Sequence, residues 1–487
     1  MKPGNLEIKK LKTGINGFDL LLNGGVPENR ALLIVGSAGT GKTVFLNSFV
    51  YYGIKSFNQN AVFVTFEEKP EDIKKNVRSF GWDYDALIRS GKLVFVDASH
   101  DGDVSEYESG RYDFTPVIER IKYAVKKNKA KRVAIDSLSA LFEQFSDQKA
   151  IRRFFFTLYD ELKKMGVTTL ISAEKSADGQ FSKFAVEQYV VDGVIEVDFK
   201  AGQQHILREM TVRKLRGTTF KVGKVDFEIT AQGVEVYPKI AIRRDILNTS
   251  YDIRLSSENA KLDSLLNGGF PQGHMCLVTG NTGTGKSMMA AHFLLDGLRK
   301  GEKGVYVALE EHVDEVKKAS MARGIDLGSF EKKGLLRFVS PDSLIDIAAD
   351  KFLYQIINML TQINAKRLVF DSVTSLASAT MSEESVRQFL IQMACFLKMK
   401  GVTCLATYLS TASFGASSDQ LLSGLETNAM RLSSIVDCII LLRYVERNQS
   451  IKKLLTVLKI RGSRHSKDIM EFEISEKGIE IKEIFKS

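Results

Sequence analysis

The chain has 487 residues, of which 44% are hydrophobic and 26% are charged, and both values are ordinary for a globular protein. With only 7 Pro and an ordinary 37 Gly, it cannot belong to the collagen-like or low-complexity classes. No apolar run approaches the roughly 18 residues that span a membrane, and the charged segment 1–12 lacks the apolar centre of a signal peptide. We therefore expect a cytoplasmic protein that does not bind membranes.

The net charge and the cysteines give little information about function. The net charge is 68 − 59 = +9, which over this length fits a mixed-charge surface better than a nucleic-acid-binding one. Cys276, Cys395, Cys404 and Cys438 have no paired metal-ligand spacing and lie in apolar contexts. They are predicted to be reduced core residues.

In chain order, the first half reads as short apolar strands alternating with helices. Strands are expected at 31–35, 61–66, 93–96, 133–135 and 168–171, and helices at 44–52, 117–127 and 151–164, with another helix starting at Pro70. The segments 194–199, 208–214, 226–229 and 234–237 are expected to form antiparallel strands. The predicted fold class is α/β, with a mostly parallel twisted sheet covered by helices on both faces.

The second half repeats the first. Five motifs recur in the same order: Leu-Leu-Asn-Gly-Gly at 21–25 and 265–269, Gly-x-x-x-x-Gly-Lys-Thr/Ser at 36–43 and 280–287, Glu-Glu at 67–68 and 310–311, Asp-Ser at 136–137 and 371–372, and Lys-x-Arg-Gly-Thr/Ser at 214–218 and 459–463. The chain is therefore a tandem duplication. We expect one domain at 1–240 and a second at 250–487, joined by a linker at about 238–250.

Each Gly-x-x-x-x-Gly-Lys-Thr/Ser motif lies between a predicted strand and a predicted helix, as a P-loop does. Its backbone N–H groups can surround phosphates, Lys42 and Lys286 can reach the β- and γ-phosphates, and the hydroxyls of Thr43 and Ser287 can bind Mg²⁺. The predicted cofactors are ATP and Mg²⁺. The predicted P-loop residues are Gly36, Ser37, Ala38, Gly39, Thr40, Gly41, Lys42, Thr43, Gly280, Asn281, Thr282, Gly283, Thr284, Gly285, Lys286 and Ser287.

Acids follow two of the predicted strands in each half. Asp136 and Asp371 end apolar strands, where a Walker B acid orients the water shell of Mg²⁺. Glu67 and Glu310 are expected to end strands beside the P-loop strand, where a carboxylate can accept a proton from the attacking oxygen. Glu68 and Glu311 would share this role or bind the metal; alternatively, these pairs are solvated acids at helix starts.

Two cations recur at spacing i, i+2 late in each half. Lys214 and Arg216, like Lys459 and Arg461, would point to one face of a strand and could reach a triphosphate held by an adjacent subunit. The alternative is a basic edge strand that discourages aggregation.

These motifs, together with Thr-Phe-Glu-Glu at 65–68, Arg-Ser-Phe-Gly-Trp at 78–82 and Ile-Ile-Leu-Leu-Arg-Tyr-Val-Glu at 439–446, make the chain resemble the KaiC circadian clock family over roughly residues 8–482. The resemblance implies two tandem RecA-like P-loop domains, a homohexamer in two tiers, and ATP bound between neighbouring subunits. It also implies a slow ATPase in the first half and a serine/threonine autokinase and autophosphatase in the second, acting as a timing or signalling switch.

The resemblance also carries residue roles. Glu67 and Glu68 would act on the lytic water, while Glu310, assisted by Glu311, would be the general base of the second half. Metal contacts would come from Thr43, Glu68, Ser287 and Glu310, and the phosphoacceptors would be Ser433 and Ser434. Further ATP contacts would come from Ser79, Lys214, Leu215, Arg216, Thr218, Arg323, Lys453, Lys459, Ile460, Arg461, Ser463 and His465.

Several positions depart from the family pattern. Ser434 is Ser rather than Thr, Arg323 replaces a Trp, Phe220 replaces a His and Asn428 replaces a Thr. The chain stops at Ser487 without the long tail that binds KaiA, so we expect no KaiA-type partner, whereas a KaiB-like partner could use the segment between Asp97 and Val133. Two other classes stay open: a RecA-like nucleic-acid-dependent ATPase or recombinase, and a non-catalytic scaffold held together by nucleotide. No DNA-binding domain or aromatic-basic stretch supports the first, so nucleic acid is not an expected partner.

Overall fold

The computed structural model divides into two compact units, Met1–Lys239 and Ile240–Ser487. Each contains a nine-stranded sheet and a separate two-stranded sheet. The structure describes residues 8–98, 114–139, 148–175, 190–199, 208–239, 252–341, 349–378, 383–410, 432–447, 449–475 and 478–485. The predicted linker therefore lies almost wholly outside the described residues, as do Asn428 and residues 99–113 of the segment assigned to a KaiB-like partner.

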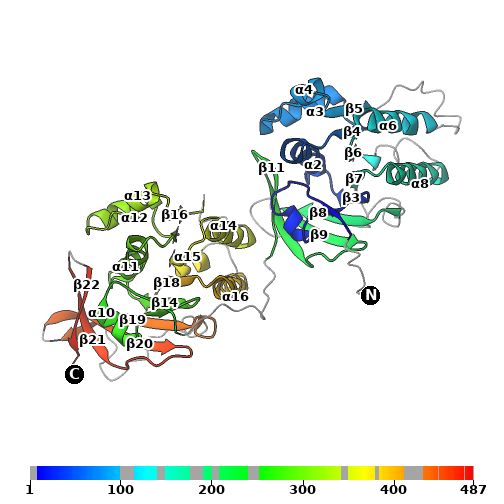
Figure 1. The fold of residues 1–487 in the computed structure, drawn as a ribbon. Helices are drawn as coiled ribbons and strands as arrows, with labels where there is room; N and C mark the ends of the chain where they lie inside the picture. Colours follow the sequence, from blue (N-terminus) through cyan, green and yellow to red (C-terminus); the bar gives the residue numbers. More distant parts are fainter. Residues whose placement is uncertain are drawn as a thin grey trace, which may run out of the picture. The chain divides into compact units, whose positions relative to one another are not determined.

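In the first unit, the strand order of the large sheet is β11-β10-β9-β8-β3-β7-β6-β4-β5, and β8 to β5 are parallel (Figure 1). Its elements are β1 (Lys10–Leu11), α1 (Phe18–Leu21), β2 (Val26–Pro27), β3 (Ala31–Gly36), α2 (Lys42–Phe57), β4 (Ala61–Thr65), α3 (Pro70–Val77), the 3-10 turn η1 (Arg78–Phe80), α4 (Tyr84–Arg89), β5 (Leu93–Asp97), α6 (Thr115–Asn128), β6 (Arg132–Asp136), α8 (Gln148–Lys164), β7 (Thr168–Glu174), β8 (Gly193–Phe199), β9 (Arg208–Leu215), β10 (Lys224–Thr230) and β11 (Gly233–Tyr237).

The second unit repeats this plan with the order β16-β15-β17-β18-β14-β19-β20-β21-β22. Its elements are β12 (Arg254–Leu255), α10 (Ala260–Leu265), β13 (Phe270–Pro271), β14 (Met275–Gly280), α11 (Lys286–Arg299), β15 (Gly304–Ala308), α12 (Val313–Met321), α13 (Leu327–Lys332), β16 (Leu336–Val339), α14 (Ala349–Gln362), β17 (Arg367–Asp371), α15 (Val373–Ser378), α16 (Glu383–Lys400), β18 (Thr403–Leu409), β19 (Cys438–Arg447), β20 (Ser450–Ile460), β21 (Ile469–Ser475) and β22 (Gly478–Ile484).

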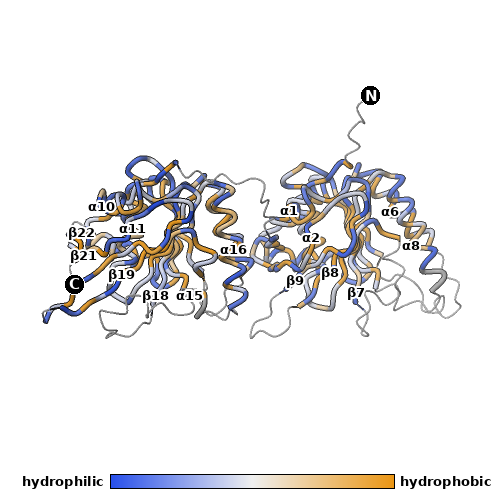
Figure 2. The backbone as a smooth tube through the Cα atoms, turned by 90° about the horizontal axis from the view of Figure 1, so that it is seen from below, coloured by the Kyte–Doolittle hydropathy of each residue, from blue (hydrophilic) through white to orange (hydrophobic). Residues whose placement is uncertain are grey.

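Hydrophobic strands run through the middle of each unit, as Figure 2 shows in orange. The apolar face of each helix is buried against them. Side chains of α1, α2 and α3 form one core layer of the first unit with one face of β3, and side chains of α6 and α8 form the other layer with the opposite face. In the second unit α11 covers one face and α14 and α16 cover the other. None of the helices in the described ranges is long and apolar enough to span a membrane.

The predicted α/β fold class is confirmed, with two corrections inside it. Glu67 does not follow a strand beside the P-loop strand, because β7 and β6 lie between β3 and β4; β15 in the second unit is separated from β14 in the same way. In addition, β8 is not wholly antiparallel: it pairs parallel with β3 and antiparallel with β9. Strand order depends on crossover connections, which a local sequence pattern does not contain.

Three of the four cysteines are buried as predicted, whereas Cys395 is only partly buried, and all four are free thiols. Within the part of the chain that the structure describes, no cluster of three or more His, Cys, Asp or Glu side chains could hold a metal ion.

Candidate active sites

The first P-loop connects β3 to α2. Gly41 has φ 99°, a backbone conformation that a side chain would strain, and it precedes the first residue of the helix, Lys42. Gly36 leaves no room for a side chain, because an added Cβ would lie 2.3 Å from the Val197 carbonyl oxygen on β8. Lys42 Nζ donates to the carbonyl oxygens of Gly36 at 2.9 Å and Ser37 at 3.0 Å. The loop therefore presents backbone N–H groups and a buried ammonium at a helix N-terminus, which suits a phosphate.

Three acids lie around this loop. Asp136 ends β6, accepts a hydrogen bond from the hydroxyl of Ser172, and lies near the hydroxyl of Thr43. Burial raises the pKa of Asp136, and those two hydroxyls oppose the rise. Burial also lowers the pKa of Lys42, an effect that Glu174, Asp136 and Glu67 oppose in that order. The charge of Lys42 in the loop and the charges of these acids therefore affect one another.

The Glu67–Glu68 pair follows β4. The hydroxyl of Ser137 donates to Glu67 Oε2 at 3.0 Å, and the Phe66 N–H donates to the Asp136 carbonyl at 2.7 Å, which joins the ends of β4 and β6. Glu68 accepts a hydrogen bond from Asn76 at 3.2 Å. Burial raises the pKa of Glu68, and the nearby Asp136 and Glu67 carboxylates add to the rise. The two glutamates therefore differ: Glu67 is exposed at the strand end, whereas Glu68 is half-buried.

The donor set around Thr43 fits Mg²⁺. Thr43 lies near enough to Asp136 to lower the pKa of its carboxyl group, so one protein hydroxyl and one acid lie together beside the phosphate-binding loop. Mg²⁺ is commonly held by one or two protein oxygens, with substrate phosphates and water completing its octahedron, and does not need a dedicated protein cage. The lack of a larger acid cluster among the described residues is therefore compatible with such a site.

The second half builds the same arrangement. Lys286 Nζ donates to the carbonyl oxygens of Gly280 at 2.9 Å and Asn281 at 2.8 Å. Burial lowers the pKa of Lys286, and Glu310 and Asp371 oppose this effect. The Ser372 hydroxyl donates to Glu310 Oε1 at 2.5 Å, as Ser137 does to Glu67. Glu311 is exposed next to it.

The acid of the second half has its own partners. The Tyr306 hydroxyl donates to Asp371 Oδ2 at 2.7 Å, and the Thr407 hydroxyl donates to Oδ1. Phe63 occupies the position of Tyr306 in the first half, at the third residue of β4. Sequence reasoning missed Tyr306, Thr407 and Ser172, because each looks like an ordinary strand residue until the strands are paired.

The four late cations lie toward the end of the strands opposite to the P-loop of their own unit. Lys459 is level with Ile439 on β19, which is level with Leu277, three residues before Gly280. At about 3.3 Å per residue, that separation is roughly 10 Å along the strand. Lys214 on β9 is placed in the same way, level with Val194. The predicted i, i+2 strand pair needs one correction, because β9 and β20 end before Arg216 and Arg461.

The cations of the second half bind the turn that precedes β19. Lys459 Nζ donates to the carbonyl oxygens of Ser433 at 2.5 Å and Val436 at 3.0 Å. Arg461 donates to the Ser434 carbonyl at 3.1 Å and to Asp437 Oδ1 at 3.0 Å. In the first half Lys214 donates to the Val191 carbonyl at 2.8 Å. Burial lowers the pKa of Lys214 and of Lys459, and the adjacent arginine in each motif adds to this effect.

The remaining residues with a predicted ATP contact are dispersed. Leu215 and Ile460 bury their side chains, so they can offer only backbone groups to a nucleotide. Lys453 lies over the Tyr444 ring at 5.8 Å, and Ser463 accepts a hydrogen bond from Arg254 at 2.7 Å. Thr218, Arg323 and His465 lie far from the P-loops in the sequence. Within the described residues, no hydrogen bond or ion pair connects any of the three to a P-loop.

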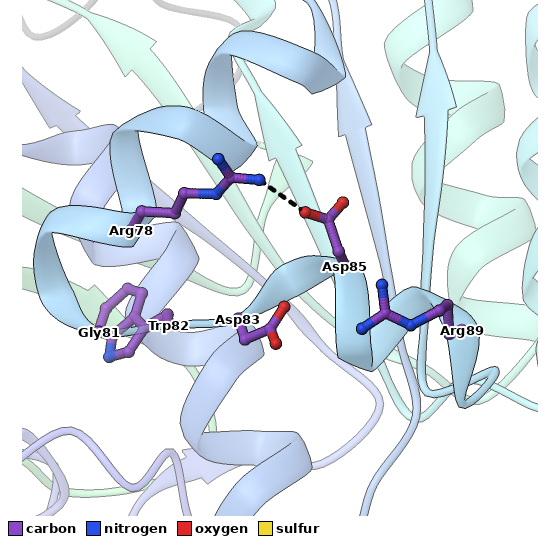
Figure 3. Close-up of a pocket in the computed structure, with 6 residues that line it drawn as sticks. All are labelled: Arg78, Gly81, Trp82, Asp83, Asp85 and Arg89. Atoms are coloured by element: carbon purple, nitrogen blue, oxygen red, sulfur yellow. Dashed lines mark hydrogen bonds and ion pairs between the residues drawn. The ribbon is translucent and has the colours of Figure 1, made fainter.

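Ser79 lies in η1, where its hydroxyl donates to the Asn76 carbonyl at 2.8 Å. The adjacent pocket has a volume of about 360 Å³ and is lined by Arg78, Gly81, Trp82, Asp83, Asp85 and Arg89. Figure 3 shows Asp85 pointing to Arg78, with which it forms a 2.9 Å ion pair. No P-loop residue lines this pocket, so it is not the phosphate site.

Two P-loops, each followed by a strand-end Asp and a strand-end Glu on a mostly parallel sheet, define a tandem RecA-like P-loop ATPase. The family model "ATPase: KaiC" matches residues 11–241 and again 258–486. The chain is 37% identical over 484 residues to the circadian clock oscillator protein KaiC of Thermostichus vulcanus, covering 99% of this chain and 90% of that one.

Other relatives have the same description. The chain is 37% identical to KaiC of Prochlorococcus marinus, with 99% of this chain and 93% of that one covered, and 36% identical to KaiC of Synechococcus elongatus, with 99% and 90% covered. The chain belongs to the KaiC family of ATPases, which confirms the family predicted from the sequence.

Proposed function

We propose that each half binds ATP with Mg²⁺, that the first half hydrolyses it slowly, and that the second half transfers its γ-phosphoryl group to Ser433 and Ser434 and can remove it again. The domains would be 1–240 and 250–487, joined by a linker at about 238–250. The observation that carries this proposal is the position of the acceptor turn. Lys459 and Arg461 hold it by its carbonyl oxygens, at the end of the strands opposite to the P-loop of the same unit.

Hydrolysis in the first half needs a base near the γ-phosphate. Glu67 at the end of β4 would accept a proton from the attacking water, and Ser137 would orient its carboxylate. Glu68 would assist at the metal. Lys42 would leave the carbonyl oxygens of its own loop and bind the β- and γ-phosphates, and Thr43 and Asp136 would hold the Mg²⁺. When bound, that ion supplies charge neutralisation to the phosphates.

Phosphoryl transfer in the second half would use the equivalent residues, with a serine hydroxyl in place of water as the nucleophile. A serine hydroxyl is weak at neutral pH, so Glu310 would take its proton while the oxygen bonds to the γ-phosphorus and the bond to ADP breaks. In-line attack requires the acceptor oxygen to come within about 3–3.5 Å of phosphorus. Since the acceptor turn lies at the end of the strands away from its own P-loop, the phosphate donor would be ATP bound by a neighbouring subunit. A ring of subunits, a hexamer by resemblance to the family, satisfies this requirement.

Mass spectrometry of the full chain after incubation with Mg·ATP tests the transfer. We expect phosphate on residues 433 and 434 in the wild type, little in Glu310→Gln, and none on this turn in Ser433→Ala/Ser434→Ala. Glu331→Gln, which changes a half-buried acid in α13 that is paired with Lys317, is the matched control and should behave as the wild type. An assembled wild type that hydrolyses ATP but carries no phosphate on either serine would leave only a two-site ATPase.

A further inference from the structure

The first half carries an acid beside its P-loop that the second half lacks. Glu174 ends β7, the strand next to β3, and is level with Gly36. Its Oε1 lies 3.9 Å from Lys42 Nζ. In the second half Leu409 occupies the corresponding place at the end of β18, level with Gly280.

The backbone at these two positions is held in the same way. The Glu174 N–H donates to the Ser139 hydroxyl at 2.6 Å, and the Leu409 N–H donates to the Thr374 hydroxyl at 2.7 Å. The difference between the two sites is therefore the side chain itself, a half-exposed carboxylate in one and an isobutyl group in the other.

Lys175, the residue after Glu174, forms ion pairs with other acids. Lys175 Nζ lies 2.6 Å from Glu196 Oε1 and 2.6 Å from Asp198 Oδ2 on β8, and Arg213 also binds Glu196. Among the described residues, the ion pair of Glu174 is with Lys42, so its negative charge acts on the cation proposed to bind phosphate.

Strand order places this carboxylate between the P-loop and Asp136. Since β7 lies between β3 and β6, Glu174 lies between the P-loop and Asp136, which is the side where a γ-phosphate would extend beyond Lys42. Repulsion between like charges falls with distance, so a carboxylate here opposes a triphosphate more than a diphosphate. It also competes with the phosphates for the Lys42 ammonium.

We propose that Glu174 is a specificity-determining residue that lowers the preference of the first-half site for ATP over ADP, whereas Leu409 leaves the second-half site with a stronger preference for ATP. This inference rests on the proposed binding of nucleotide at Lys42. ADP would then compete with ATP more effectively in the first half than in the second. A rise in the ADP:ATP ratio would therefore slow hydrolysis in the first half before it affects the second half.

The test compares the dissociation constants of ADP and a β,γ-imido ATP analogue in the full chain, by displacement of a fluorescent nucleotide. Lys286→Ala confines binding to the first half. In that background we expect Glu174→Gln to raise the ratio of the ADP constant to the analogue constant by about three- to tenfold, a value reduced for solvent exposure. Glu119→Gln, an exposed acid of α6 paired with Lys122, should leave the ratio unchanged.

The reciprocal change gives a second arm. In a Lys42→Ala background, Leu409→Glu should lower the same ratio in the second half. If both nucleotides bind in the Lys286→Ala background and Glu174→Gln leaves the ratio unchanged, the role of Glu174 is wrong while the proposed function stands. If neither nucleotide binds in that background, the proposed first-half site itself fails.

Discussion

The Lys459 ammonium donates a 2.5 Å hydrogen bond to the carbonyl oxygen of Ser433, and Arg461 makes the equivalent contact with Ser434. Two cations of one strand end therefore bind the backbone of the two proposed phosphoacceptors. A phosphate on either hydroxyl adds about −1.5 to −2 charges beside them. The same cations cannot hold the carbonyl oxygens and a phosphate with full strength, so phosphorylation is expected to loosen or reshape this turn.

Removing Lys459 should loosen the turn even without nucleotide. In Lys459→Met the carbonyl oxygens of Ser433 and Val436 lose their donor, so amide hydrogen exchange over residues 432–437 should become severalfold faster. Mass-spectrometric hydrogen exchange of the ligand-free protein measures this. Lys214→Met is the control from the first half and should accelerate exchange near Val191 but not in this turn. Unchanged exchange over 432–437 in Lys459→Met would show that the contact does not hold the turn.

Replacing Asp136 should stabilise the ligand-free protein while removing the proposed role of this acid at Mg²⁺. Burial raises the pKa of Asp136 above its unfolded value, so the ionised carboxylate destabilises the fold at neutral pH and this cost disappears as pH falls below the unfolded pKa. We therefore expect Asp136→Asn to raise the free energy of unfolding at pH 7.5 and to give a smaller gain in acid. Urea unfolding at two pH values measures this.

The control for that experiment is Asp192→Asn, because Asp192 is a buried acid with a salt bridge to Arg30 at 3.2 Å and a hydrogen bond from Tyr159 at 2.9 Å. Its neutralisation should destabilise the protein instead. A loss of stability in Asp136→Asn equal to that in Asp192→Asn would contradict the inference that the buried charge of Asp136 destabilises the fold at neutral pH.

Arg132 should be one of the most costly positions to change in the first unit. It is fully buried at the start of β6, and it donates to the carbonyl oxygens of Lys12, Thr13 and Phe49 and to Gln59. Burial lowers its pKa to about 10. Arg132→Met would leave these acceptors unpaired beneath the P-loop helix, at a cost of about 3–5 kcal/mol.

Urea unfolding followed by limited proteolysis should show the first unit of Arg132→Met opening at lower urea while the second unit keeps its wild-type midpoint. Arg153→Met, at an exposed position of α8, should change the stability by no more than about 0.5 kcal/mol. Equal stability of the two variants would mean that Arg132 does not anchor α2.

Local sequence patterns predicted the parts of the site that are themselves local. The P-loops, and Asp136 and Asp371 at strand ends, could be predicted because glycine spacing and apolar runs are read over a few residues. The position of Glu67 at the end of β4, separated from the P-loop strand β3 by the two strands β7 and β6, could not be predicted, since strand order is set by crossovers. For the same reason, the sequence did not reveal Glu174, whose proposed role depends on β7 lying beside β3. It also did not reveal the contact between Tyr306 and Asp371, which are 65 residues apart in the chain.

Steady-state ATP hydrolysis by the full chain tests the division of labour most directly. The comparison is between the wild type, Glu67→Gln/Glu68→Gln and Glu310→Gln, with assembly checked by light scattering in Mg·ATP. The account predicts that the double variant assembles but hydrolyses ATP at least about 100-fold more slowly, because it lacks the first-half base, while Glu310→Gln retains most of the hydrolysis. Hydrolysis that survives in the double variant and disappears in Glu310→Gln would contradict it.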